Sequence, residues 1–461
     1  MSTRETTLTR PPATATAPRS SLSPDRVVSL VALAGIAVGT LVVIGLWWQD
    51  TQFIFGLGDW LTNAGRLTGL LAGYAVVVLL GLMARVPWLE HGVGTDRLAR
   101  WHAMGGRYTV CLSVAHTLLI IWGYAVTAHT SVTSETATLV LTYPDVLMAT
   151  VGVLLLIGVG ITSARAARRR MSYEAWHFVH LYTYLAVALA FSHQFATGAD
   201  FTDPKVRVLW SAMYIVVGSA LLWFRVITPL LGLSRHRLRV LEVRRESRDV
   251  VSVYITGRRL DALGAVPGQF FRWRFLTRDL WFAANPYSLS AVPASDVLRI
   301  TVKVTGRHSA ALAGLRPGTA VLAEGPYGSF TAARRRRRRK VLLIGAGVGI
   351  TPLRALFESL PGQPGDITMV YRASRVEDLV LRSELDEIAA ARGARVHYVV
   401  GSRRDSRADP LSVNRLIRLV PDLRHHDVFI CGPDQLATSV RAQLRRAQVP
   451  AGNIHHESFT F

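Results

Sequence analysis

Long apolar runs in the first half of the chain alternate with short polar connections that are rich in arginine. A helix needs about 20 apolar residues to cross a hydrocarbon core of about 30 Å. We expect six membrane-spanning helices, at residues 27–48, 67–84, 104–127, 145–164, 174–194 and 207–229. After Pro229 the pattern changes to short β-rich runs, Gly and Pro turns and many charges, which is typical of a soluble domain.

The connections between these spans differ in charge from one side to the other. Arginines gather in the segments 4–26, 85–100 and 165–170, whereas the other side holds Arg66, Lys205 and Arg207. The positive-inside rule places the arginine-rich side in the cytoplasm, and six spans return the second half of the chain to it. We therefore predict a multi-pass cell-membrane protein. Its expected parts are a disordered cytoplasmic tail at 1–26, a transmembrane bundle at 27–232 and two cytoplasmic domains at 233–332 and 333–461.

The chain is strongly basic, with 53 Lys and Arg against 31 Asp and Glu and a formal net charge of +22. We assign this charge to inner loops and to a domain held against an anionic leaflet, and not to nucleic-acid binding. The run RRRRRRK at 334–340 either faces the membrane, which we favour, or attracts an anionic nucleotide. The two cysteines, Cys111 and Cys431, fall in different predicted domains, so neither a disulfide nor a four-thiolate iron–sulfur cluster is expected.

Histidines interrupt the apolar pattern of the third and fifth predicted spans. His102 and His116 are 14 residues apart and His180 and His193 are 13 apart, so each pair covers about 20 Å of helix. Both spans start on the cytoplasmic side, so each supplies one histidine at an inner depth and one at an outer depth. Facing imidazoles can ligate haem iron from both sides. The pattern predicts two b-type haems, one between His102 and His180 and one between His116 and His193.

The 13-residue spacing is less regular than the other. At about 100° per residue, a 14-residue step returns to within about 40° of the same helix face, whereas a 13-residue step misses it by about 140°. We expect the fifth span to be kinked or locally rewound, or to be approached differently by its two haems. His177 is an alternative inner ligand, and a hydrogen bond between helices is the alternative for any single membrane histidine.

Strand-like runs between about 235 and 330 predict a small antiparallel β-barrel. Its loops include PGQFFRWRF (267–275), NPYSLS (285–290), GRHSAAL (306–312) and GPYGSF (325–330). Aromatic and hydroxyl side chains suit an isoalloxazine ring, and glycines allow the backbone to approach a diphosphate. Together these loops predict a flavin site.

A dinucleotide-binding pattern follows at VLLIGAGVGITPLRALFESL, which reads as a strand, a glycine loop and a helix. Thr351 suits the N-cap of this helix and Pro352 its first turn. Backbone N–H groups of the loop can meet a diphosphate at the positive end of the helix. Further strand–helix units follow at ITMVYRAS, VHYVVGSRRDSR and VFICGPDQLATSV, so we predict a parallel α/β domain.

Positive charge follows the next two strands of this predicted domain, where a 2′-phosphate would bind. It is provided by a group of Arg and Ser residues, Arg372, Arg375, Ser402, Arg403 and Arg404. No acidic residue closes the second strand, so NADPH is favoured over NADH; the alternative is that these arginines form a solvated rim. The chain ends in HHESFTF, where an aromatic ring can cover a flavin or can simply close the core.

Over nearly its full length after the tail, the chain resembles the ferric reductase and NADPH oxidase superfamily of transmembrane flavocytochromes. The histidine spacings match the bis-haem pattern of that family, and the second half is similar to the ferredoxin–NADP reductase fold. The resemblance implies that Tyr287 contacts the flavin or its ribityl chain and that Ser288 approaches flavin N5. It also implies that Cys431 lies near the nicotinamide and that Phe459 stacks on the flavin.

The chain departs from the family at Asn285, where an Arg or His usually stands, so Arg272 or Arg274 is expected to supply the cation for the flavin phosphate. The residues expected to take part in hydride transfer are Ser288, Cys431 and Phe459. The residues expected at FAD are Arg272, Asn285, Pro286, Tyr287, Ser288, Gly306, Ser309, Gly325, Gly328 and Phe459. The residues expected at NADPH are Gly345, Gly347, Gly349, Thr351, Pro352, Arg372, Ser402, Arg403, Gly432 and Pro433.

These features predict a transmembrane oxidoreductase that moves electrons from cytoplasmic NADPH through FAD and two b-type haems to an acceptor across the membrane. A ferric or other metal chelate is favoured as acceptor, because the resemblance is to the general bacterial branch of the family. Dioxygen, with superoxide as product, and a quinone or periplasmic protein partner are the alternatives. The outer loops near 49–66, 128–143 and 195–206 contain no metal-binding cluster. A haem-free reductase on an inert anchor is the remaining alternative.

Overall fold

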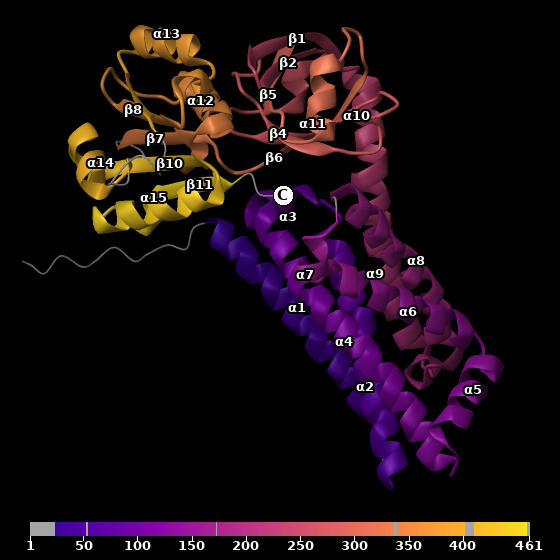
Figure 1. Ribbon diagram of the computed structural model, residues 1–461. Helices are drawn as coiled ribbons and strands as arrows, with labels where there is room; N and C mark the ends of the chain where they lie inside the picture. The colour runs from indigo at the N-terminus through magenta and orange to yellow at the C-terminus, as the bar shows by residue number, and fades with distance from the viewer. Residues whose placement is uncertain (1–23, 52–53, 172, 336–338, 402–409, 459–461) are drawn as a thin grey trace, which may run out of the picture.

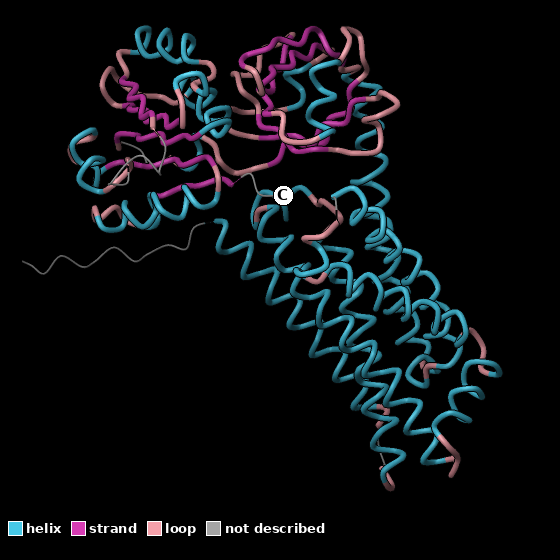
Figure 2. Tube along the Cα trace, viewed as in Figure 1, coloured by secondary structure: helices cyan, strands magenta, loops and turns pink. Residues whose placement is uncertain are grey.

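The computed structural model of the protein describes residues 24–51, 54–171, 173–335, 339–401 and 410–458 (Figure 1). An elongated helical bundle, formed by the first half of the chain, has two smaller domains at one end. Figure 2 shows that the strands are confined to these two domains and that the bundle is helical. The order of parts follows the hydropathy pattern, with the apolar helices first and the strand-rich domains after them.

The bundle contains long helices joined by short turns. Its helices are α1 (Pro24–Gln49), α2 (Leu57–Leu82), α3 (Pro87–Val93), α4 (Thr95–Thr127), α5 (Val132–Thr142), α6 (Val146–Ser163), α7 (Arg165–Arg168), α8 (Tyr173–Thr197), α9 (Pro204–Leu222) and α10 (Thr228–His236). A π-helical turn at Trp223–Ile227 joins α9 to α10. Large apolar side chains such as Leu41, Leu154 and Val216 are exposed on the bundle, as expected for a surface that faces lipid.

Five helical stretches are long and apolar enough to cross a membrane. Among the described residues they are Val27–Gln49, Leu57–Leu82, Arg97–Thr127, Val146–Ser163 and Pro204–His236. They correspond to the first, second, third, fourth and sixth predicted spans. Helix α8 is 25 residues long, but the polar side chains of its histidines, tyrosines and Gln194 lower its mean hydropathy. A sixth span at α8 is therefore not confirmed and stays a prediction.

The first of the two smaller domains, here called the β domain, is antiparallel. Its strands are β1 (Arg239–Ser247), β2 (Val250–Thr256), β3 (Phe270–Phe275), β4 (Asn285–Ser288), β5 (Val297–Lys303) and β6 (Val321–Tyr327). They form two three-stranded sheets, ordered β1-β2-β5 and β4-β3-β6, around a core that includes Phe271 and Trp273. In the described part of the chain, two isolated bridges, Arg239 with Ala320 and Leu289 with Ile300, and a few neighbouring backbone hydrogen bonds connect the two sheets. The expected continuous barrel is therefore not confirmed.

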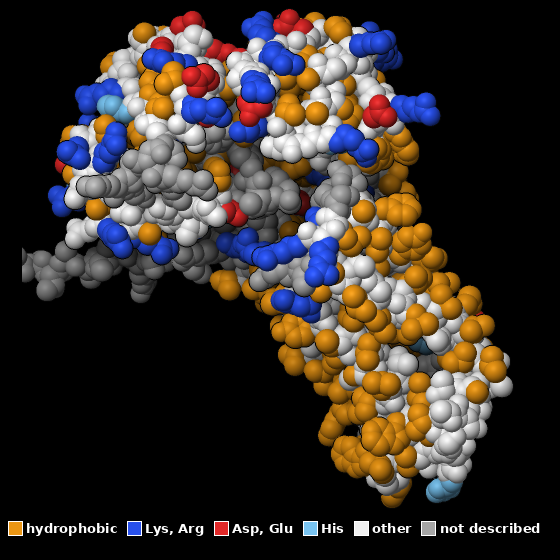
Figure 3. All heavy atoms as spheres, viewed as in Figure 1, with side chains coloured by type: hydrophobic (Ala, Val, Ile, Leu, Met, Phe, Trp, Pro, Cys, Tyr) orange, Lys and Arg blue, Asp and Glu red, His pale blue; other side chains and the backbone are white. Residues whose placement is uncertain are grey.

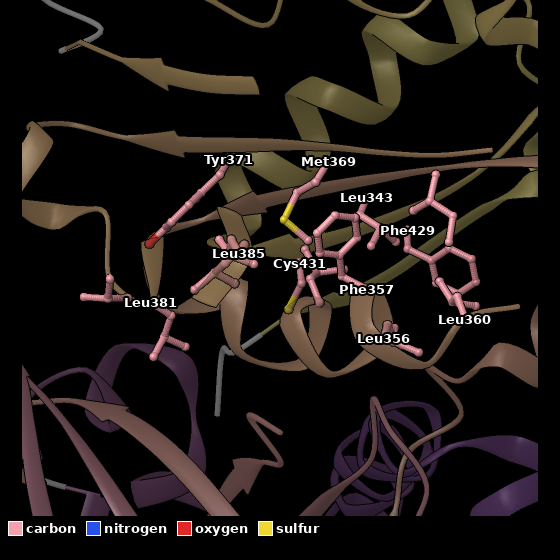
Figure 4. Close-up of a cluster of buried hydrophobic side chains, with 14 of the residues drawn as sticks. Leu343, Leu356, Phe357, Leu360, Met369, Tyr371, Leu381, Leu385, Phe429 and Cys431 are labelled. Carbon is pink, nitrogen blue, oxygen red and sulfur yellow. The ribbon is translucent and has the colours of Figure 1, made fainter. Parts of the chain in front are cut away.

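The second, here called the α/β domain, contains a five-stranded parallel sheet of order β11-β10-β7-β8-β9. Its strands are β7 (Lys340–Ala346), β8 (Ile367–Ala373), β9 (Arg395–Val400), β10 (His426–Gly432) and β11 (Ile454–Ser458), and its helices are α12 (Ile350–Ser359), α13 (Arg382–Arg392), α14 (Val413–Leu419) and α15 (Asp434–Arg446). Figure 4 shows Leu343, Met369, Phe429 and Cys431 of the central strands packed with Phe357 of α12. Strands buried on both faces explain the apolar runs of the sequence, and the predicted parallel α/β domain is confirmed.

Ion pairs connect the three parts of the molecule. Arg85, which follows α2, contacts the carboxylate of Glu324 on β6, and so joins the bundle to the β domain. Arg299 on β5 donates to both carboxylate oxygens of Glu384 on α13, at 2.7 and 2.8 Å. Arg354 on α12 approaches the same carboxylate to 2.8 Å. Glu384 thus joins the β domain to the α/β domain.

Glu384 is the shared acceptor of this second junction. Burial by itself would raise its pKa, but hydrogen bonds from Arg299 and the charges of Arg299 and Arg354 hold that pKa below its ordinary value. The charged form is therefore the one that stabilises the junction. Its contribution is present above the unfolded pKa of about 4.3 and is lost as the pH falls through the lower folded value.

We expect Glu384→Gln to lower the free energy of unfolding at pH 7 by about 1 to 2 kcal/mol, because it leaves Arg299 buried without its counter-charge. Thermal unfolding of the full-length protein in detergent, followed by flavin fluorescence, would measure this. Glu387→Gln is the matched control, since Glu387 is exposed on the same helix. Equal melting points for the two variants at pH 7 would contradict the assignment, and the difference should shrink below about pH 4.

Candidate functional site

Two pairs of histidine rings face each other between α4 and α8. The ring centroids of His102 and His180 are 6.0 Å apart, and those of His116 and His193 are 6.3 Å apart. A metal ion bonded at about 2.0 Å to a nitrogen of each ring, with about 1.1 Å from nitrogen to ring centre, would give a separation of about 6.2 Å. Both pairs therefore have the spacing of two imidazoles on opposite sides of one metal.

Backbone carbonyls fix the orientation of three of these rings. The Nδ1 atom of His102 lies 3.2 Å from the carbonyl oxygen of Leu79, and that of His116 lies 2.8 Å from that of Gly65, both on α2. His193 Nδ1 lies 2.5 Å from the carbonyl oxygen of Ala190. A carbonyl can only accept, so in each of these rings Nδ1 carries the proton and Nε2 keeps its lone pair for a metal.

The expected distortion of the fifth span is not found, because α8 is an unbroken α-helix from Tyr173 to Thr197. The side chains of His180 and His193 leave α8 in different directions, and this brings both rings toward α4 despite the 13-residue spacing. His193 turns back onto its own helix at Ala190, whereas His180 stacks on Trp176 with ring centroids 5.0 Å apart. The interplanar angles of the two histidine pairs differ accordingly, at 73° and 45°. The ring opposite His102 is that of His180, while His177 lies against Trp176.

A cavity of about 400 Å³ adjoins the pair formed by His116 and His193. His116, His193, Gly69, Trp210 and Tyr214 are among its lining residues. A Cβ atom on Gly69 would lie 2.6 Å from His116 Nδ1, so glycine is required there to make room for the ring. The volume is within the range of cofactor pockets.

In the described part of the chain, the four histidines form two pairs, and neither pair belongs to a larger group of possible metal ligands. In the part of the chain that the structure describes, no group of three or more His, Cys, Asp or Glu side chains is arranged to hold a metal ion. A metal between two imidazoles would need its other ligands from a prosthetic group. The four equatorial nitrogens of a porphyrin meet that need, so the residues present fit haem.

Strand β4 carries the residues expected at the flavin. Ser288 is buried, and its hydroxyl has no hydrogen-bond partner among the described residues. A buried polar group without a partner is costly, so this hydroxyl fits a role in contacting a ligand. Burial raises the pKa of the neighbouring Tyr287 to about 12, so its phenol stays protonated at neutral pH. Its backbone oxygen accepts from Trp273 Nε1 at 2.9 Å.

Both arginines expected to replace the missing cation at Asn285 are used within the β domain. Arg272 donates to the carbonyl of Ala284 at 3.2 Å, and Arg274 donates to that of Trp281 at 3.1 Å. The side chain that contacts Asn285 is instead His308 on α11 (Arg307–Ala311), whose Nδ1 lies 2.6 Å from the Asn285 amide nitrogen. Sequence analysis missed His308, although it lies inside the GRHSAAL stretch that was singled out.

The other residues expected at the flavin lie on α11, β4 and β6 or directly beside them. Ser309 Oγ accepts from the backbone N–H groups of Thr305 and Gly306 at 2.9 and 3.0 Å. Pro286 is on β4 beside Arg272, and Gly325 and Gly328 follow one another around the end of β6. Gly328 has φ +93°, which favours glycine.

Three of the residues expected at the nucleotide line a second cavity, of about 450 Å³, at the carboxyl edge of the parallel sheet, whereas Gly345, Gly349, Thr351, Pro352 and Gly432 are not among its lining residues. Gly347, Arg372 and Pro433 contribute from the α/β domain, and Lys303 and Asp249 contribute from the β domain. The pocket therefore lies between the two domains, at the usual ligand position of an open α/β sheet.

The glycine loop of this edge is closely packed. A Cβ atom on Gly349 would lie 2.3 Å from the carbonyl oxygen of Cys431, so the loops after β7 and β10 touch backbone to backbone. Gly345 is the next-to-last residue of β7, and Gly432 is the last residue of β10. The prediction that Thr351 caps α12 is wrong: the helix begins at Ile350, after a 3₁₀ turn, and Thr351 Oγ1 donates to the carbonyl of Val348 at 2.9 Å. Pro352 follows within the first turn.

Cys431 is fully buried at the end of β10, beside Glu457 of β11. Burial, reinforced by the negative charge of Glu457, raises the pKa of the Cys431 thiol well above its ordinary value. The Glu457 carboxylate also lies 3.4 Å from the position of a Cβ atom on Gly328, so it connects the thiol to the flavin loops. Sequence analysis missed Glu457, because only the pairing of β11 with β10 brings it there.

Four of the predicted residues lie outside the described residues, namely Ser402, Arg403, Arg404 and Phe459. Phe461 and residues 336–338 of the basic run also lie outside them. Arg375 is described, and its backbone N–H donates to Asp378 at 3.1 Å. At the start of the basic run, Arg334 donates to Ser329 Oγ at 2.6 Å and Arg335 contacts the carbonyl of Pro361. These two arginines are bound to loops of the molecule itself.

Comparison with known proteins gives two family matches. Residues 68–191 match the ferric reductase like transmembrane component, and residues 343–442 match the oxidoreductase NAD-binding domain. The solved FAD/NAD binding domain of a nitric oxide dioxygenase from Vibrio cholerae is 25% identical, with a TM-score of 0.40, over 48% of this chain and 98% of that chain.

Curated relatives are similar over about half of this chain. An NADPH oxidoreductase of Mycobacterium tuberculosis is 29% identical over 46% of this chain and 57% of its own length. The ferredoxin reductase component of a 3-ketosteroid-9-alpha-monooxygenase from Mycolicibacterium smegmatis is 32% identical over 50% of this chain and 67% of its own length. The chain belongs to the ferric reductase and NADPH oxidase superfamily, as an oxidoreductase in which a ferric reductase-like transmembrane domain precedes an FAD- and NAD(P)H-binding reductase.

Proposed function

We propose that this protein is a transmembrane oxidoreductase that passes electrons from cytoplasmic NADPH, by way of FAD and two b-type haems, to a metal acceptor such as ferric iron at the opposite surface. The observation that carries this proposal is the pair of histidine couples, with ring centroids 6.0 and 6.3 Å apart, between α4 and α8. When bound, FAD supplies hydride chemistry and the haems supply one-electron chemistry. The bundle, with α8 as its sixth span, supplies a path across the membrane.

In this proposal the histidines hold the haems, with His102 and His180 at the inner depth and His116 and His193 at the outer depth. Backbone carbonyls hold the proton of His102, His116 and His193 on Nδ1 and leave Nε2 as the ligand atom. Glycine at residue 69 makes room for the His116 ring. The ion pair between Arg85 and Glu324 would hold the β domain, with its proposed FAD, at the inner end of the bundle.

The reductase half orients nicotinamide and flavin in this proposal. NADPH would bind in the cavity between the two domains, with Arg372 near the nucleotide and the backbone of Gly347 near its phosphates. Ser288 would donate its hydroxyl proton to a ring nitrogen of the flavin. Cys431 would present a neutral thiol beside the nicotinamide, because its pKa is raised by burial. The roles of Ser402, Arg403 and Phe459 remain predictions from the family resemblance.

The acceptor is tested with the full-length, cofactor-loaded protein, reduced anaerobically with NADPH and then mixed with a ferric complex or with dioxygen. Fast reoxidation by the ferric complex, with slow dioxygen consumption, is expected. Fast dioxygen consumption with superoxide release would instead make the protein an oxidase. Slow reoxidation by both would indicate a quinone or a protein partner as acceptor.

We expect His116→Ala to lower the haem content from two per chain to one, because it removes one axial ligand of the outer haem while His102 and His180 keep the inner one. The haem-to-protein ratio measures this directly. NADPH should still reduce the flavin, and acceptor reduction should fall at least about a hundredfold. His129→Ala is the control, because His129 is exposed in the loop after α4. Two haems retained in His116→Ala would contradict the assignment.

We expect His308→Ala to weaken FAD binding about five- to thirtyfold, because the imidazole beside Asn285 would donate to the flavin phosphate in place of the usual cation. FAD titration of flavin-depleted full-length protein measures the change. Arg316→Ala is the control, since it removes an exposed cation elsewhere in the β domain. If both variants bind FAD equally well, His308 has no part in the site.

A further inference from the structure

The end of the bundle far from the reductase domains is acidic, although the chain as a whole is strongly basic. Its connecting segments, 50–66, 128–145 and 198–207, carry three basic residues, Arg66, Lys205 and Arg207. They also carry six acidic residues, Asp50, Asp59, Glu135, Asp145, Asp200 and Asp203. The formal net charge of these segments is therefore −3. On the face shown in Figure 3, Lys and Arg side chains gather over the reductase domains and the adjoining end of the bundle.

Arg66 is the basic residue that lines the outer cavity, and its charge is neutralised there. Its Nε and Nη2 atoms donate to the two carboxylate oxygens of Asp200 at 3.2 and 2.8 Å. Nη1 donates to Asn63 Oδ1 at 3.1 Å, and Nη2 also contacts Asp50. Asp200 is buried and lines the same cavity, while the side chain of Asp50 is 51% exposed. The carboxylates around Arg66 thus outnumber its single positive charge.

The two other basic residues do not reverse this balance. The guanidinium group of Arg207 lies over the ring of Phe195, 5.7 Å from its centroid. Lys205 follows Asp203, whose carboxylate caps α9 by accepting from the Lys205 N–H at 2.8 Å. An anion that approaches the outer cavity therefore meets an excess of negative charge, and a cation meets attraction.

Given the proposed function, on which this step rests, we infer that the outer site reduces cationic metal complexes in preference to anionic chelates. One electron that originates from NADPH passes to the complex, so a trivalent metal ion leaves as the divalent ion with its ligands unchanged. No bond to the protein is needed, because an outer-sphere acceptor only has to come close to the edge of the proposed outer haem. Attraction raises the local concentration of a cation there and lowers that of a ferric chelate with net negative charge.

The test is the sign of the salt dependence, which does not depend on the potential of the acceptor. Full-length, cofactor-loaded protein in phosphatidylcholine nanodiscs is reduced anaerobically and mixed with hexaammineruthenium(III) or with ferricyanide. Between about 10 and 200 mM salt, the rate with the cation should fall about three- to tenfold, and the rate with the anion should rise. A rate that does not depend on salt, or that falls for both acceptors, would overturn the inference.

Both faces of a nanodisc are accessible, so direct reaction at the reductase domains is measured with His116→Ala and subtracted. This control also separates two kinds of failure. If His116→Ala reacts as fast as the unchanged protein, the proposed electron path fails. If His116→Ala is slow but the salt dependence has the wrong sign, only the charge preference fails.

Two matched double variants test whether the salt dependence arises from the acidic end of the bundle. Asp59→Asn with Asp203→Asn removes two negative charges, and asparagine can still cap α9. We expect this double variant to lose more than half of the salt dependence with hexaammineruthenium(III). Asp261→Asn with Asp296→Asn removes two exposed charges from the β domain and should change nothing. Equal effects of the two double variants would contradict an outer site of selection.

Discussion

A polar ring inside a hydrocarbon-facing bundle must have partners at both of its nitrogens, and this constraint orders the rest of the structure. For His102 and His116 the partner at Nδ1 is a carbonyl of α2. A helical carbonyl can be shared in this way only if the two helices approach closely, and α2 has glycine at 58, 65 and 69 on the side that meets α4. The rings of His180 and His193 on α8 lie opposite these two rings, at centroid distances of 6.0 and 6.3 Å.

The junctions between the three parts of the molecule also depend on paired polar groups. Buried ion pairs are costly to desolvate, and both junctions have an acidic group that is shared between two arginines. Glu324 lies near Arg85 and Arg274, and Glu384 lies near Arg299 and Arg354. Each carboxylate thus bridges elements that are far apart in sequence. This fixes the β domain between the bundle and the α/β domain.

Features that depend on periodicity or on local spacing in the sequence could be predicted. Five apolar spans, the parallel sheet and the match of His102 to His180 and of His116 to His193 could all be predicted in this way. His308 and Glu457 could not, because each reaches its site through pairing of elements distant in the chain. Thr351 was misjudged because α12 begins at Ile350, two residues before the predicted start at Pro352. Of the alternatives given for the fifth span, local rewinding is not found, because α8 is an unbroken α-helix.

The carbonyl partners of the histidines have a consequence for how this scaffold can vary. Hydrogen bonding at the far nitrogen of an axial imidazole alters the basicity of the ligand and hence the reduction potential of the metal. In this bundle the bonds to His102 and His116 come from main chain, so no replacement of a polar side chain can delete them. In the proposed haem sites, these two hydrogen bonds would change only with the register and separation of α2 and α4. Helix packing would then help to set the reduction potentials of the proposed haems, in addition to its structural role.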